Sequence, residues 1–217
     1  MTVKIGSVPD LRLQRLQAFL GGLYASDPKL EIEVWHLRSA DQLARLRDGA
    51  LDLGLLHAER DDAPVEIAPV FPGELVAAFV PPGHLLGGKQ ALAPADLVEE
   101  VLLVPARSGD PDVHDAVMRC LASAGYEFRN VRETAGSDTR DVLFAVAEGR
   151  GIALLPASVD AVVGELGDVV TRRELGPTPS MPDTLLAWSA TPRPELAGLV
   201  SLARGLAQEL YRSSERP

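Results

Sequence analysis

The chain lacks paired cysteines, a long hydrophobic run and an excess of positive charge. Cys120 is the single cysteine, so an internal disulfide is excluded, and its apolar neighbours predict a buried structural thiol. Because no apolar run reaches the roughly eighteen residues of a membrane-spanning helix, we expect no membrane partner. Lys and Arg number 21 against 31 Asp and Glu, and this net charge of -10 argues against direct binding to nucleic-acid phosphates.

Enzyme signatures are missing as well. The sequence contains no H-E-x-x-H, C-x-x-C or G-x-S-x-G motif and no glycine-rich phosphate loop. Gly149 and Gly151 stand at a helix end ahead of a strand, which is the reverse of a dinucleotide fingerprint. The four histidines are scattered without the spacing of metal ligands. We therefore expect no catalytic residue, no cofactor and no metal, and we predict that the protein is not an enzyme.

The first residues also lack the basic and apolar regions of a secretory signal, and they run directly into a strand pattern. This start predicts a cytoplasmic protein.

A repeated unit organises the chain. In its first copy, Ser39 opens a short helix, Gly49 suits the left-handed residue that closes it, and 51–56 is apolar enough for a buried parallel strand. The second copy covers 137–156 and has Gly149 at the corresponding helix end. Two copies of one unit predict two similar α/β domains.

The remaining patterns place the two domains along the chain. Strands and helices alternate from the start, and Asp10 is the expected cap of the first helix. The last segment has leucines at helical spacing and no sheet of its own to cover, so we expect it to return to the first domain. The predicted lobes are 1–79 together with 188–217, and 80–187.

Candidate binding residues follow from the expected topology. In open α/β sheets, ligands bind beyond the carboxyl ends of the strands, where helix N-termini offer unpaired N–H groups. Helix capping is the simpler role for each hydroxyl or carboxylate there, and convergence from two domains is what favours a binding site. The predicted ligand-binding residues are Ser7, Asp10, Leu11, Arg38, Ser39, His57, Arg107, Pro111, Val113 and Ser137.

Five segments carry a resemblance to a known family. They are I-G-S-V-P-D from Ile5, D-P-K-L-E-I-E-V from Asp27, L-R-D-G-A-L-D-L-G-L from Leu46, P-P-G-H-L-L from Pro81 and V-A-E-G-R-G-I-A-L-L-P from Val146. In this order and spacing, they resemble the effector-binding regulatory region of LysR-type transcriptional regulators. That region has a two-lobed fold similar to type 2 periplasmic binding proteins.

The resemblance implies a specific architecture and function. Two Rossmann-like lobes would be joined by crossover strands near 80–82 and 187–189, and a small-molecule effector between them would bias an open–closed equilibrium. Relatives normally begin with a winged helix-turn-helix, which is absent from this chain, so DNA would be a partner only through that domain. We expect a regulatory fragment of a longer regulator. The alternatives are a stand-alone solute-binding protein of the same fold, which the missing signal disfavours, and an enzyme.

The resemblance also implies a homodimer. In the family, the first helix and second strand of one copy, here 11–26 and 32–36, pack against the other lobe of the partner, here 113–125 and 128–132.

Asp10 departs from the family pattern, in which a small hydroxyl residue commonly helps to hold an effector carboxylate. Two unpaired like charges at about 4 Å repel by several kcal/mol in a partly buried site. An anionic effector would need compensation from Arg12, Arg38, His57 or Arg107, whereas a neutral, amine-bearing or hydroxyl-bearing effector would not. The third alternative is that Asp10 only caps its helix.

Overall fold

The computed structural model describes residues 2–57, 64–136, 139–159 and 169–214. The chain divides into two compact units: unit 1 is Met1–Gly73 with Asp183–Pro217, and unit 2 is Glu74–Pro182. Both boundaries fall earlier in the chain than 79/80 and 187/188, because strand β5 pairs within unit 2 and strand β11 pairs within unit 1. Among the described helices, none is long and apolar enough to cross a membrane.

Unit 1 contains a five-stranded sheet in the order β2-β1-β3-β11-β4. Its strands are β1 (Thr2–Ser7), β2 (Glu31–His36), β3 (Leu53–Leu56), β4 (Val65–Phe71) and β11 (Thr184–Ser189). β1 pairs in parallel with both β2 and β3, whereas β11 runs antiparallel to β3 and β4. The parallel half of the sheet therefore has three carboxyl ends at one edge.

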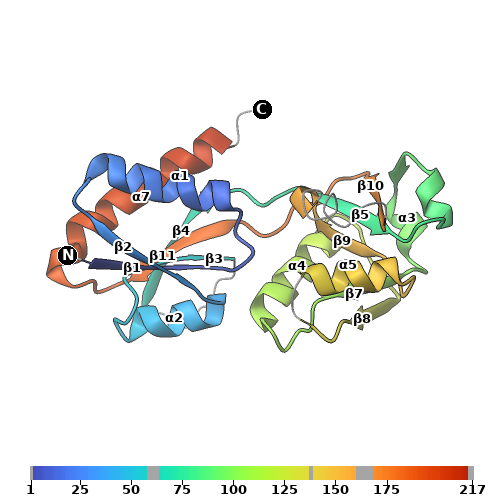
Figure 1. The fold of residues 1–217 in the computed structure, drawn as a ribbon, viewed down its shortest axis with the longest axis horizontal. Coiled ribbons are helices and arrows are strands. Elements are labelled where there is room, and N and C mark those ends of the chain that lie inside the picture. The colour runs from blue at the N-terminus through green and yellow to red at the C-terminus, as the bar shows by residue number, and fades with distance from the viewer. Residues whose placement is uncertain (1, 58–63, 137–138, 160–168, 215–217) are drawn as a thin grey trace. The chain divides into compact units, whose positions relative to one another are not determined.

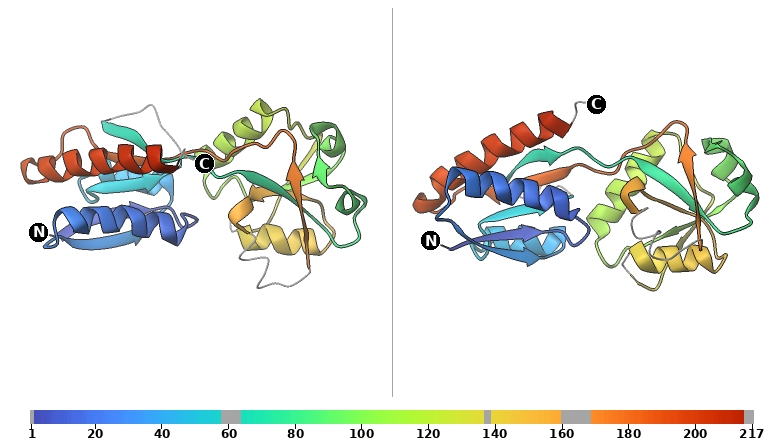
Figure 2. Two further views of the ribbon diagram at one scale, coloured as in Figure 1. Left: turned by 90° about the horizontal axis from the view of Figure 1, so that it is seen from above. Right: turned by 45° about the horizontal axis from the view of Figure 1, so that its top comes forward.

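Helices cover both faces of this sheet (Figures 1 and 2). α1 (Leu13–Ser26) and α7 (Ala197–Ser214) lie side by side on one face, and α2 (Ser39–Arg47) lies on the other. Side-chain alternation explains this arrangement, because Leu53 and Leu55 of β3 join the core under α1 and α7 while Leu56 joins the core under α2. The terminal helix packs on the first unit, as its amphipathic pattern predicted.

Unit 2 contains a four-stranded sheet in the order β6-β10-β5-β9 and a parallel pair of β7 and β8. Its strands are β5 (Val76–Val80), β6 (Ala91–Leu92), β7 (Val101–Val104), β8 (Asn130–Glu133), β9 (Ala153–Pro156) and β10 (Thr171–Leu175). The helices are α3 (Pro94–Leu97), α4 (Pro111–Ser123) and α5 (Thr139–Ala147), with short 3-10 turns at Leu85–Gly88 and Ala157–Val159. A bridge between Leu102 and Ile152 links β7 to the segment before β9.

β5 is buried on both of its faces. Val76, Ala78 and Val80 pack with α3 and α4, while Ala77 and Phe79 pack with α5. The two-residue period of a strand produces this division, and it makes β5 the centre of the unit 2 core.

The duplicated helix–glycine–strand unit is confirmed in both halves. Gly49 after α2 and Gly149 after α5 have φ of 69° and 73°, the left-handed conformation that a residue with a Cβ adopts at a cost. The strands that follow, β3 and β9, are buried as expected.

Three details differ from the sequence-based expectations. α1 begins at Leu13 with Arg12 at its N-cap position, so Asp10 belongs to the preceding turn and is not the cap. Arg38 takes the N-cap position of α2, which makes Ser39 the first helical residue. Cys120 is half-buried and not fully buried, because α4 turns mainly Leu121 into the core.

We predict opposite effects on stability for two glycine substitutions. In Gly151→Ala, the new Cβ would lie 2.4 Å from the backbone oxygen of Val101, which accepts a hydrogen bond from the N–H of Ile152. We therefore expect a loss of about 1–3 kcal/mol. Gly21 lies inside α1 with nothing within 4 Å of a Cβ, so Gly21→Ala should stabilise by about 0.5–1 kcal/mol. Urea unfolding measures both, and equal effects would contradict the packing at Gly151.

Candidate functional site

The carboxyl ends of β1, β2 and β3 meet at one edge of the unit 1 sheet, which we call the site edge. The register pairs Ser7 with His36 of β2 and with Leu55 of β3. The turn 8–11, the start of α2 and His57 follow directly from these three ends. The structure therefore brings together six of the predicted residues, which are Ser7, Asp10, Leu11, Arg38, Ser39 and His57.

Asp10 and His57 form the charged centre of this group. A carboxylate oxygen of Asp10 lies 3.6 Å from Nε2 of His57, and their side chains are 65% and 16% exposed respectively. Nδ1 on the other side of the ring lies 3.5 Å from the hydroxyl of Thr184, the first residue of β11. The imidazole is thus held on both sides, while the carboxylate remains open to solvent.

The contact shifts both pKa values in favour of an ion pair. Partial burial alone would raise the pKa of Asp10, but the interaction with His57 lowers it below the ordinary 3.8. Burial alone would lower the pKa of His57, but Asp10 and the backbone of Asp183 raise it above the ordinary 6.5 despite the opposing charge of Arg15. A carboxylate next to an imidazolium is therefore the favoured state in mildly acidic solution.

Ser39 connects the start of α2 to the end of β3. Its side chain is almost completely buried, and its hydroxyl accepts a hydrogen bond of 3.3 Å from the backbone N–H of His57. The sequence suggested a capping role, but this contact instead fixes the backbone that carries the imidazole. The neighbouring Arg38 is exposed at the same edge.

Ser7 and Leu11 have mainly structural contacts. Ser7 is buried, its hydroxyl donates to the carbonyl of Val8, and its own carbonyl accepts from the N–H of Leu37. Leu11 is partly buried against the cores on both faces of the sheet. These two residues support the site edge more than they present polar groups to a ligand.

Sequence reasoning missed Gln42, which is fully buried beside this edge. Its amide nitrogen donates to the carbonyls of Leu37 and Leu55. A signal was present, because Gln42 falls three residues after Ser39 and one before Leu43, on the inward face of α2. A polar residue on an otherwise apolar face indicates a specific buried partner.

The predicted residues of unit 2 gather at the start of α4. Asp110 caps the helix by accepting from the N–H of Val113, and Pro111 occupies the first turn. Arg107 makes two hydrogen bonds to Asp115, of 2.9 and 2.7 Å, and these lower the pKa of that carboxyl. Ser137 lies outside the described residues.

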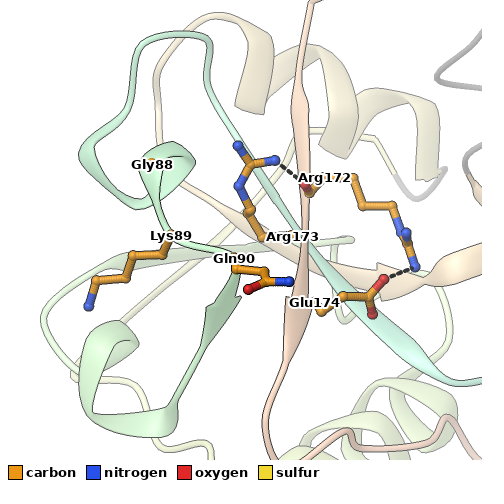
Figure 3. A pocket seen from close by; sticks show the side chains of 6 residues that line it. All are labelled: Gly88, Lys89, Gln90, Arg172, Arg173 and Glu174. Carbon is orange, nitrogen blue, oxygen red and sulfur yellow. Dashed lines mark hydrogen bonds and ion pairs between the residues drawn. The ribbon is translucent and has the colours of Figure 1, made fainter.

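A hollow of about 370 Å³ in unit 2 contains none of the predicted residues. It is lined by Gly88, Lys89, Gln90, Arg172, Arg173 and Glu174. Two of its arginines already interact with neighbouring groups: Arg172 forms an ion pair with Glu174, and Arg173 donates hydrogen bonds to backbone carbonyls. Figure 3 shows the side chains of Lys89, Arg172 and Arg173 pointing in different directions, which does not suit a shared ligand. In the part of the chain that the structure describes, no group of three or more acidic, histidine or cysteine residues suits a metal.

Comparison with known families agrees with this architecture. The family model of the LysR substrate binding domain matches residues 1–206. The chain belongs to this family. Among its relatives is the probable hydrogen peroxide-inducible genes activator of Mycobacterium avium, which is 27% identical over 91% of this chain and 64% of the relative. The regulator BenM of Acinetobacter baylyi is 25% identical over 74% of this chain and 53% of its own length. The LysR substrate binding domain described here thus spans about half to two thirds of these relatives.

Solved structures of LysR effector-binding domains share the fold. The BenM effector binding domain with its effector benzoate has a TM-score of 0.74 at 20% identity, covering 100% of this chain and 95% of that one. The reduced OxyR regulatory domain of Pseudomonas aeruginosa has a TM-score of 0.68 at 18% identity, covering 95% and 97%. The expected two-lobed fold, similar to periplasmic binding proteins, is confirmed.

We predict that the Asp10–His57 pair stabilises this LysR domain within a defined pH range. The raised pKa of His57 adds stability that is full below about 6.5 and lost as the pH rises through the folded value. The lowered pKa of Asp10 adds stability that is full above about 3.8 and lost as the pH falls through the folded value. Asp10→Asn should therefore cost more at about pH 5.5 than at about pH 8, by less than about 1 kcal/mol because solvent screens the pair.

Urea unfolding at the two pH values measures this difference. Asp48→Asn, at the other end of α2, is the matched control and should change the free energy of unfolding equally at both. The same loss at both pH values in Asp10→Asn would contradict the ion pair.

Proposed function

We propose that this chain is the effector-sensing domain of a LysR-type transcriptional regulator. It binds a small-molecule effector at the strand ends of unit 1, and it catalyses no reaction. The observation that carries the proposal is the group of polar residues at three strand ends of unit 1, within a domain of this family. Open α/β sheets bind ligands at this position.

The chemistry of the site edge supports binding more than catalysis. Asp10 offers an exposed carboxylate, and His57 offers a ring that Thr184 orients. The hydroxyls of Ser39 and Thr184 are both buried, so no solvent-accessible hydroxyl nucleophile adjoins the imidazole in the described site. Asp10 and His57 are therefore suited to recognise a ligand by hydrogen bonding and charge.

Several relatives are named as hydrogen peroxide-inducible activators, which raises thiol oxidation as a rival signal. Cys120 is the single cysteine of the 217 residues, so an internal disulfide has no second thiol. An internal disulfide is thus excluded as the signal, and the signal that we propose is a bound molecule. DNA contact belongs to a helix-turn-helix domain outside this sequence, and a regulator of this kind acts in the bacterial cytoplasm.

The proposed effector is neutral or carries an amine or hydroxyl group toward Asp10. An exposed carboxylate repels a second carboxylate nearby, and His57 compensates only one negative charge because it is already paired with Asp10.

A thermal-shift screen of metabolites tests the proposed function. A compound at a hundred times its Kd adds about 2.7 kcal/mol to the folded state, which raises the Tm of a domain of this size by roughly 5–10 °C. We expect amine-bearing or neutral compounds to give such shifts, and benzoate to give a smaller one. A broad metabolite library without any shift would contradict the proposal.

The same screen on Asp10→Ser tests the class of effector. Removing the carboxylate should reduce the shift given by amine-bearing or neutral compounds and increase that given by benzoate, while Asp48→Ser should change neither. Unchanged shifts for both kinds of compound would show that Asp10 has only a structural role in the turn and does not recognise the effector.

We also propose a homodimer in which α1 and β2 of one copy pack against α4 and β8 of the other. All four residues of β8 are exposed, including Val131 at 45%, and α1 exposes Leu13 and Tyr24. Exposed apolar side chains on a strand favour pairing with another surface.

Sedimentation velocity at micromolar concentration tests this assembly. Val131→Arg should shift dimer toward monomer, because a charge would be buried without a partner. Phe144→Arg, at an apolar residue of α5 that is 53% exposed, should leave the dimer intact. A monomeric unmodified chain would contradict the proposal.

A further inference from the structure

Gln42 has an unusual set of contacts for a fully buried side chain. Its amide nitrogen donates hydrogen bonds of 2.8 Å to the carbonyl of Leu37 and 3.0 Å to the carbonyl of Leu55. Its amide oxygen is also buried, and no described group donates to it. The two carbonyl partners identify which end of the amide is the nitrogen.

The amide fills a notch that two glycines create in the sheet. Gly6 of β1 and Gly54 of β3 are neighbours in the parallel register. A Cβ at Gly6 would lie 2.7 Å from the oxygen of Gln42, and one at Gly54 would lie 2.8 Å from it. Side chains at these two positions would therefore expel the amide, so the three residues form one packing unit.

The two accepting carbonyls lie on different segments of the site edge. Leu37 joins β2 to α2, and its N–H donates to the carbonyl of Ser7 at the end of β1. Leu55 lies in β3, and its carbonyl also accepts from the N–H of Val8. One side chain thus connects the ends of β2 and β3 directly, and both reach β1 through one further hydrogen bond.

Packing alone does not explain this residue. A buried acceptor without a donor is unfavourable, and an apolar side chain of similar length would fill the same notch without that cost. What an apolar side chain lacks is the pair of hydrogen bonds to Leu37 and Leu55. The contribution specific to the amide is therefore the geometry of the strand ends.

We propose that Gln42 is a positioning residue, which holds the ends of β2 and β3 together and thereby fixes Ser39 and His57. Its importance for ligand recognition rests on the proposed function, whereas its effect on the strand ends does not.

Amide hydrogen exchange measured by NMR tests the proposal without any ligand. In Gln42→Met, which keeps length and removes both donors, the amides of Val8, Leu37 and His57 should exchange about tenfold faster relative to those of α7. Gly54→Ala displaces the same amide by crowding and should give the same local pattern, so the test survives if one variant fails to fold. The control is Leu199→Ala, which removes core volume under α7 on the opposite face of the sheet.

The comparison separates positioning from general destabilisation. Faster exchange confined to the strand ends in both Gln42→Met and Gly54→Ala, but absent in Leu199→Ala, supports the proposal. A uniform increase in all three variants overturns it. Because hydrogen exchange is measured without an effector, its result does not depend on the proposed function. A thermal-shift screen that finds no ligand would refute the proposed function but would not affect the exchange result.

Discussion

The parallel pairing of β1 with both β2 and β3 is the constraint on which the candidate site depends. Parallel strands place their carboxyl ends at the same edge, and the observed register brings Ser7 level with His36 and Leu55. The segments that leave this edge are short, so their first residues have little freedom to diverge. Asp10, Ser39 and His57 therefore meet because of backbone pairing, before any side chain interacts.

Polar contacts then refine what the backbone has assembled. His57 is held by Asp10 and Thr184 through its ring and by Ser39 through its N–H. Gln42 ties the strands that carry these residues. The apolar cores on both faces of the sheet stabilise unit 1, while this smaller network determines how its edge is presented. The stability of unit 1 and the geometry of the candidate site thus depend largely on different residues.

Much of the fold was predictable from local pattern. The left-handed glycines after α2 and α5, the buried strands β3 and β9 and the cap at Asp110 follow from short-range chemistry that is visible in sequence. The start of α1 was not predictable in this way. Asp10 is a favourable capping residue, yet the turn at 8–11 delays the helix to Leu13 because Leu11 hydrogen-bonds back to Val8.

The sequence by itself determined the order of elements, the duplicated unit and the segments that carry the family resemblance. Only the tertiary structure decided the partners of individual polar groups. The hydroxyl of Ser39 accepts a hydrogen bond from the N–H of His57, and Arg107 donates to Asp115. The side chain of Gln42 occupies the notch between Gly6 and Gly54. These contacts join residues whose relation depends on strand register and helix rotation. Local patterns record which residues face inward, but a specific hydrogen bond requires distances that the packed chain alone defines.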